Sequence, residues 1–152
     1  MSPPPPAIDP HRFGGRLRDR ALGLLLLAAG ATVLFAGRTL TPDPDGIGTH
    51  TALGLSPCGF LNSTGLPCAT CGMTTATALA ARGRLVDSAL TQPAGFAFAL
   101  TCALAVLAGA WITWRGTSLR PVGRVLLNAK PVAAVVGLIL LGWIYKAAAM
   151  LL

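Results

Sequence analysis

Three long apolar runs constrain the fold of this chain more than any other feature. They fall within residues 21–37, 94–114 and 132–150, the last interrupted only near its end by Lys146. A helix needs roughly 17–25 apolar residues to cross the hydrocarbon of a bilayer. Only 11% of the residues are charged, whereas soluble domains usually carry about 25%. The sequence therefore predicts an all-α integral membrane protein with three transmembrane helices.

The segment before the first run is polar and holds four consecutive prolines, Pro3 to Pro6, followed by four arginines. Such a segment buries too little apolar surface to offset the entropy of folding. We therefore expect a disordered tail over residues 1–20 and a single helical membrane domain over 21–152. The first run is longer than the apolar core of a usual signal peptide, and no clear cleavage site follows it, so we interpret it as an uncleaved helix.

The basic residues flank the apolar runs. The chain has twelve Lys and Arg residues, five Asp and no Glu, which gives a net charge of +7. This placement favours anionic lipid headgroups rather than nucleic acid as the partner. Other membrane proteins, or a second copy of the chain, complete the expected partners. The positive-inside rule places the N-terminus and the loop 115–130 in the cytoplasm, and the first loop and the C-terminus outside the cell membrane.

The long first loop, residues 38–92, contains one helical pattern. Residues 70–82 are rich in Ala and Thr and are followed by Gly83, which is typical of a helix end. This helix is too short and too polar to span a bilayer, so we expect it to be interfacial or re-entrant. At the end of the third run, Trp143 and Tyr145 are predicted to lie at the membrane interface, with Lys146 extending to water on its apolar stem.

Residues 58–76 hold the chain's distinctive motif, in which a Cys-x-x-Cys pair follows a third cysteine ten residues upstream. The three cysteines are Cys58, Cys68 and Cys71. A helix that begins near Thr70 would direct its free N–H groups at the pair and favour the thiolate form. Residues that shape the backbone around them are Gly65, Pro67, Gly72 and Thr74. A fourth cysteine, Cys102, lies inside the second apolar run, where we expect it to pack as a small apolar side chain.

Three chemistries fit this motif, and the sequence leaves all three open. In an oxidising compartment the thiols could form a structural disulfide. As a redox pair, Cys68 would be the nucleophile and Cys71 the resolving thiol. As a metal site, the three cysteines with His50 would make a Cys3His set suited to zinc. Zinc is the one cofactor that the residues indicate, and no catalytic residue is assigned unless the pair is redox-active.

The order Thr64-Gly65-Leu66-Pro67-Cys68-Ala69-Thr70-Cys71-Gly72-Met73-Thr74-Thr75, with Cys58 upstream, resembles an uncharacterised bacterial membrane family, domain of unknown function 2752. The resemblance covers roughly residues 58–114 and implies a short helix, a break at Gln92-Pro93 and then a transmembrane helix. Three positions depart from the pattern: Gly59 and Ala69 replace prolines, and Thr75 replaces an arginine. The resemblance implies no known biochemical role.

The function predicted from these residues is that of a small multi-pass membrane protein without an enzymatic role, acting as a scaffold or accessory subunit. Its cysteine motif would be stapled by a disulfide or a metal ion. A membrane thiol–disulfide protein using Cys68 and Cys71 is one alternative, and a small transport or lipid-interacting unit is another. No phosphate-binding loop, carboxylate pair or Ser-His-Asp set is evident, so a hydrolase is not expected.

Overall fold

The computed structural model describes residues 10–117 and 129–151, and within them every regular element is a helix. In chain order the elements are α1 (Pro10–Thr39), the 3-10 helix η1 (Thr49–Leu53), α2 (Gly59–Thr64), α3 (Met73–Ala81), α4 (Leu85–Thr91), α5 (Pro93–Arg115) and α7 (Ala129–Leu151). The predicted all-α architecture is thus confirmed for the described part of the chain.

Two of these helices are long and apolar enough to cross a membrane. They span Gly15–Thr39 in α1 and Pro93–Arg115 in α5, and a shorter apolar helix covers Ala133–Ala148 in α7. The three predicted runs therefore all lie in helices, but the third has a shorter apolar core than the other two. Each helix presents large apolar side chains outwards, including Leu25, Leu107 and Leu141, which are about two-thirds exposed.

The N-terminal segment differs from the expectation of a tail that ends at residue 20. Helix α1 begins at Pro10, so residues 10–20 are helical, and only residues 1–9 of the predicted tail lie outside the described residues. Proline is favoured in the first turn of a helix. Adding a residue to an existing helix costs less free energy than nucleating a new helix. The helix that forms over the apolar run therefore extends back into the basic residues that precede it.

Helices α1 and α5 form the main packing interface through glycines. A Cβ at Gly109 would lie 2.6 Å from the carbonyl oxygen of Gly23 and 2.6 Å from the backbone nitrogen of Leu27. A Cβ at Gly30 would lie 2.7 Å from the carbonyl oxygen of Cys102. The two backbones approach this closely only because side chains are missing at the contact. Gly109 is buried, and the burial of Cys102 agrees with its predicted packing role.

Helix α3 lies against both α1 and α5 and forms the centre of the core. Its residues 75–79 are all buried. A Cβ at Gly95 of α5 would meet the Cβ of Ala76 at 2.8 Å, and one at Gly37 of α1 would meet the Cβ of Ala81 at 3.3 Å. The helix is shorter than the predicted 70–82 at both ends, and Gly83, which follows it as predicted, is left-handed with φ 82°. Small side chains therefore let this short helix enter the bundle.

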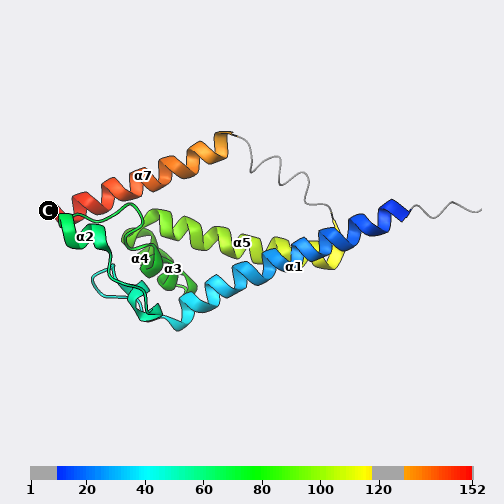
Figure 1. Cartoon of the computed structure of the whole chain (residues 1–152), viewed down its shortest axis with the longest axis horizontal. Helices are drawn as coiled ribbons and strands as arrows, with labels where there is room; N and C mark the ends of the chain where they lie inside the picture. The colour runs from blue at the N-terminus through cyan, green and yellow to red at the C-terminus, as the bar shows by residue number, and fades with distance from the viewer. Residues whose placement is uncertain (1–9, 118–128, 152) are drawn as a thin grey trace, which may run out of the picture.

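The short helices gather at one end of the molecule, as Figure 1 shows, while the N-terminal end of α1 extends from the other. The C-terminal end of α7 lies beside α2 at the loop end, and the opposite end of α7 diverges from α5. The sequence did not predict η1 or α2, which interrupt the long first loop. This arrangement brings α7 to the segment that carries the cysteines.

Candidate metal centre

The cysteine cluster, defined as Cys58, Cys68 and Cys71, is assembled from two segments of the first loop. Cys58 is the residue that precedes α2, with an extended backbone (φ −61°, ψ 110°). Cys68 and Cys71 flank a tight turn that leads into α3. The six-residue helix α2 returns the chain to the same place, because it ends at Gly65, where φ is 71°. The ten-residue separation in sequence thus closes into a local loop.

The Cys68–Cys71 turn holds the two thiols together with backbone hydrogen bonds. The N–H of Cys71 donates to the carbonyl oxygen of Cys68 at 3.0 Å, and the N–H of Met73 donates to that of Thr70 at 3.1 Å. The N–H of Cys68 donates in turn to the Sγ atom of Cys71 at 3.2 Å. An N–H group directed at sulfur favours its thiolate form, although burial outweighs this effect at Cys71.

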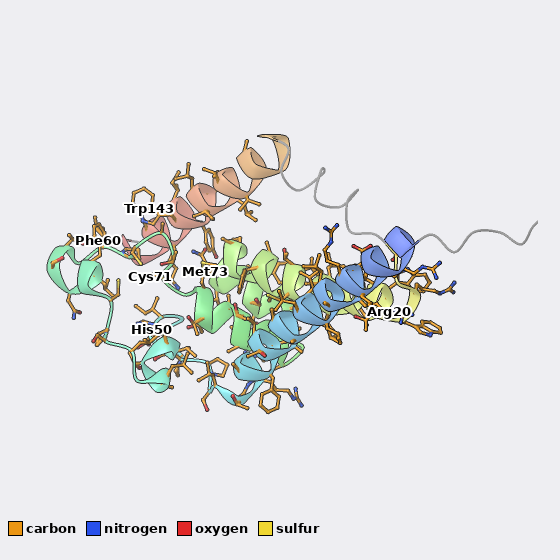
Figure 2. The ribbon with its side chains drawn as sticks, turned by 45° about the vertical axis from the view of Figure 1, so that its right-hand side comes forward. Arg20, His50, Phe60, Cys71, Met73 and Trp143 are labelled. Carbon is orange, nitrogen blue, oxygen red and sulfur yellow. The ribbon has the colours of Figure 1, made fainter. Side chains whose placement is uncertain are left out.

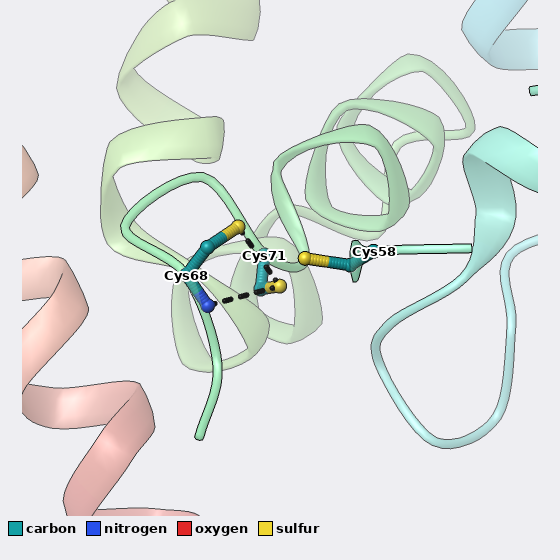
Figure 3. A group of neighbouring side chains, drawn as sticks. All are labelled: Cys58, Cys68 and Cys71. Atoms are coloured by element: carbon teal, nitrogen blue, oxygen red, sulfur yellow. Dashed lines mark hydrogen bonds between the residues drawn. The ribbon is translucent and has the colours of Figure 1, made fainter. Parts of the chain in front are cut away.

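All three sulfur atoms of the cysteine cluster lie within 4.8 Å of one another. The Sγ atoms of Cys68 and Cys71 are 3.1 Å apart, and Figure 3 shows the Cys58 sulfur facing this pair from the other side of the turn. All four cysteines of the chain are free thiols in this structure. Three convergent sulfurs can share one metal ion, which confirms that the motif forms a set of potential metal ligands.

The two thiols of the turn differ sharply in acidity. Burial raises the pKa of Cys68, but hydrogen bonds from Thr70 and Cys71 outweigh it and lower the pKa from the ordinary 9.0 to about 7. Burial and the hydrogen bond with Cys68 raise the pKa of Cys71 to about 12. At neutral pH, then, Cys68 carries most of the charge and Cys71 keeps the shared proton.

His50 lies near the cysteine cluster but is not part of it. Its Nε2–H donates to the carbonyl oxygen of Ser56 at 3.2 Å. Among the described residues, the group that could hold a metal contains the three cysteines and no histidine. The structure therefore does not assemble the predicted Cys3His set. His50 instead lines a cavity of about 390 Å³ that also borders the cysteine cluster, Asn62 and Met73.

The predicted backbone residues of the motif have separable roles. Gly72 adopts φ 87° at the start of α3, and a Cβ there would lie 2.8 Å from the carbonyl oxygen of Gly46. Gly65 has a left-handed φ but open space around it. Pro67 is fully buried, while Thr74 is half-buried and lines the cavity. Only glycine satisfies both the conformation and the close approach at position 72.

Two residues outside the motif bind the carbonyl groups on either side of Cys68. The indole Nε1–H of Trp143 in α7 donates to the carbonyl oxygen of Pro67 at 2.8 Å. The side-chain Nε2–H of Gln92 donates to that of Ala69 at 3.3 Å. Both residues were missed as site residues from the sequence. The available signal was a polar group close to one end of a membrane run, with Gln92 just before the run 94–114 and Trp143 in the second half of the run 132–150.

Lys146 does not extend to water as predicted but is buried, with 9% of its surface exposed. Its Cε atom lies 3.8 Å from the position that a Cβ would take at Gly72. The C-terminal end of α7 packs on the loop end of the molecule, as Figure 2 shows for the labelled Trp143, Phe60 and Cys71. The long side chain is therefore directed at protein and not at a membrane surface.

Thr75, one of the three positions at which the chain departs from the pattern suggested by the resemblance, belongs to a buried polar contact. It is 1% exposed, and its hydroxyl shares a 2.8 Å hydrogen bond with the hydroxyl of Thr49 in η1. The Thr49 Oγ1 atom also accepts from the N–H of Asp43 at 2.9 Å. In this chain position 75 therefore ties the first half of the loop to α3.

Residues 58–106 match the model of the family described as "Protein of unknown function (DUF2752)". The match begins at the first cysteine of the cluster and ends within α5, which confirms the resemblance for that segment. The comparison with curated proteins found no match to the chain, and neither did the comparison with solved structures.

Proposed function

We propose that this chain is a small multi-pass membrane protein that binds one zinc ion with Cys58, Cys68 and Cys71. The metal staples the first loop onto the helical bundle. The protein acts as a scaffold or accessory subunit and not as an enzyme. The observation that carries the proposal is the mutual distance of the three sulfur atoms, all within 4.8 Å.

The distances between the three sulfur atoms support a metal site, because they are close to the sulfur–sulfur distances around a zinc ion with thiolate ligands. Tetrahedral zinc with Zn–S bonds of about 2.3 Å separates its sulfurs by about 3.8 Å. Small side-chain rotations would bring three sulfurs from their present separations to that value. Soft thiolate donors select zinc over magnesium or calcium. A divalent cation would also displace the proton that Cys71 retains.

The first loop has the features of a segment that needs a staple. Helix α2 has no buried residue, and residues 51–57 and 62–66 are all exposed. Such a segment gains little from hydrophobic burial, whereas ordering its backbone costs about 1–2 kcal/mol per residue. A metal bound at both ends of α2 would stabilise the loop through the free energy of coordination.

A bilayer is the environment that best accounts for the outer surface of the helices. Large apolar side chains on α1, α5 and α7 are exposed, including Phe35, Leu104 and Ile144 at more than half of their surface. At the end of α5, Arg115 lies over the ring of Trp111 at 4.7 Å, a pairing suited to a membrane interface. With the N-terminus in the cytoplasm, the cysteine cluster lies on the extracytoplasmic side.

The test is the metal content of the protein purified in detergent. We expect about one zinc per chain in the wild type and in Cys102→Ser, which changes a buried thiol outside the cysteine cluster. Each of Cys58→Ser, Cys68→Ser and Cys71→Ser should lose most of the metal. Zinc-free wild type with a reducible Cys68–Cys71 bond, seen by intact mass after alkylation, would instead support the redox alternative.

Membrane placement is tested separately on intact cells. The protein should remain in the membrane fraction after an alkaline wash. Bound zinc shields the thiols of the cysteine cluster from labelling reagents. The side of the membrane on which the loop lies is therefore tested with Ser63→Cys, at an exposed position, in a Cys102→Ser background. A membrane-impermeant maleimide should label that cysteine if the loop faces outwards. Labelling only after the cells are permeabilised would mean that the loop faces the cytoplasm. That result would contradict the proposed orientation but not the metal site.

A further inference from the structure

The buried polar residues in the described part of the chain include one with a charged side chain, Lys146. It enters from α7, far in sequence from the first loop. The ion pair found among the described residues joins Arg84 to Asp87 and is exposed. A buried ammonium group without a compensating charge is costly. Its position therefore calls for an anionic partner.

The side chain of Lys146 packs beside two glycines, Gly46 and Gly72. Its Nζ atom lies 2.9 Å from the position of a Cβ at Gly46, and its Cε atom 3.8 Å from that at Gly72. Both glycines therefore leave room for the lysine stem. Gly72 follows Cys71 directly, so the side chain of Lys146 lies beside the backbone that carries one thiol of the cysteine cluster. The lysine side chain thus packs against the residue that directly follows the proposed ligand Cys71.

The charge of the proposed centre matches this cation. One zinc ion with three thiolates carries a net charge of −1, because the ligands contribute −3 and the metal +2. Groups that surround the ligands of a metal tune its affinity by their charge and hydrogen bonds. A single buried lysine would neutralise the centre, whereas a two-thiolate centre would be neutral without it.

We propose that Lys146 is the counter-ion of the tri-thiolate metal centre and thereby couples metal binding to the docking of α7 on the first loop. This inference rests on the proposed function. The hydrogen bond from Trp143 to Pro67 belongs to the same contact between α7 and the loop. By linkage, docking of α7 raises the affinity for the metal by the factor by which the metal stabilises docking.

The experiment measures zinc affinity by competition with a chromogenic chelator. We expect Lys146→Met to weaken zinc binding at least tenfold, in the range of other changes around metal ligands, and Lys146→Gln to do the same. Repeated in a Cys58→Ser background, with the higher zinc concentrations that its weakened two-thiolate centre needs, Lys146→Met should change the affinity less than threefold. A purely structural role for Lys146 would give the same loss in both backgrounds.

A second measurement follows the docking of α7 without changing Lys146. In the double variant Trp111→Phe/Trp114→Phe, Trp143 is the remaining tryptophan. Its fluorescence emission then reports on its burial. Removal of zinc with a chelator should shift its emission to longer wavelength, and adding zinc back should reverse the shift. This arm also decides the outcome if the Lys146 variants do not fold, as judged by circular dichroism.

The outcomes separate the two proposals. Wild type that binds no zinc overturns the proposed function and this inference with it. Wild type that binds zinc, while folded Lys146→Met binds it equally well, overturns the inference alone. An emission from Trp143 that is unchanged by chelation overturns the coupling to α7 even if the affinities differ.

Discussion

The indole Nε1–H of Trp143 donates a hydrogen bond to the carbonyl oxygen of Pro67 at 2.8 Å and so joins the last helix to the cysteine turn. The two residues are separated by 76 positions in the chain. Pro67 is fully buried, so its carbonyl group depends on this donor for hydrogen bonding. The contact is the direct physical link between the apolar helix α7 and the candidate metal centre.

Trp143→Phe should lower the free energy of unfolding by about 1–3 kcal/mol, because it leaves the buried carbonyl of Pro67 without a donor. Thermal unfolding in detergent measures the change. The matched control is Trp111→Phe, since Trp111 is 52% exposed and lies at the far end of α5. If both variants lose stability equally, the Trp143–Pro67 bond carries no special weight.

Gly72→Ala should be more damaging than Gly54→Ala. Both glycines have a left-handed φ, 87° and 77°. A Cβ at Gly72 would lie 2.8 Å from the carbonyl oxygen of Gly46, whereas one at Gly54 would have nothing within 4 Å. We expect a loss of about 1 kcal/mol from backbone strain at either site and a further 1–3 kcal/mol from the clash at Gly72. Denaturant titrations compare them, and equal losses would argue against the close approach.

The reactivity of the cysteine turn should follow pH with the sign set by its two pKa values. The thiolate is the reactive form. In reduced, metal-free protein the alkylation rate of Cys68 should therefore rise with pH, with its midpoint at the lowered pKa of about 7. Cys71, with its pKa raised to about 12, should stay slow up to pH 9. Mass spectrometry of alkylated peptides gives both rates, and a Cys68 midpoint near the ordinary 9.0 would contradict this assignment.

The glycine interface between α1 and α5 should not accept a larger side chain. Gly109→Val would place atoms against the backbone of Gly23 and Leu27, and overpacking of this kind typically costs about 1–3 kcal/mol. Gly137→Val in α7 is the control, because a Cβ there meets nothing within 4 Å. Unfolding in mixed detergent should separate the two variants, and similar midpoints would mean that the helices can part without loss.

Local patterns in the sequence predicted the helices well, because apolar runs and end signals act within one segment. The runs in α1, α5 and α7 and the Gly83 end of α3 are of this kind. The extension of α1 back to Pro10 was missed because the basic flank was judged by its own composition. Its helical state comes from the neighbouring apolar run.

The candidate site was predictable only where residues are close in sequence. Cys68 and Cys71 meet across one turn, as their spacing indicates. Cys58 joins them through α2, whose return depends on the left-handed Gly65. The burial of Lys146 depends on where α7 packs, which no local pattern specifies. For the same reason, His50 was included as a ligand although η1 directs it to Ser56.

The most direct test of the account is X-ray absorption at the zinc edge of the purified protein. We predict a first shell of three sulfur atoms at about 2.3 Å and one lighter atom. Cys102→Ser should give the same spectrum, and Cys71→Ser should lose a sulfur or the metal. A zinc shell made only of nitrogen and oxygen, or a protein without zinc, would contradict the central claim.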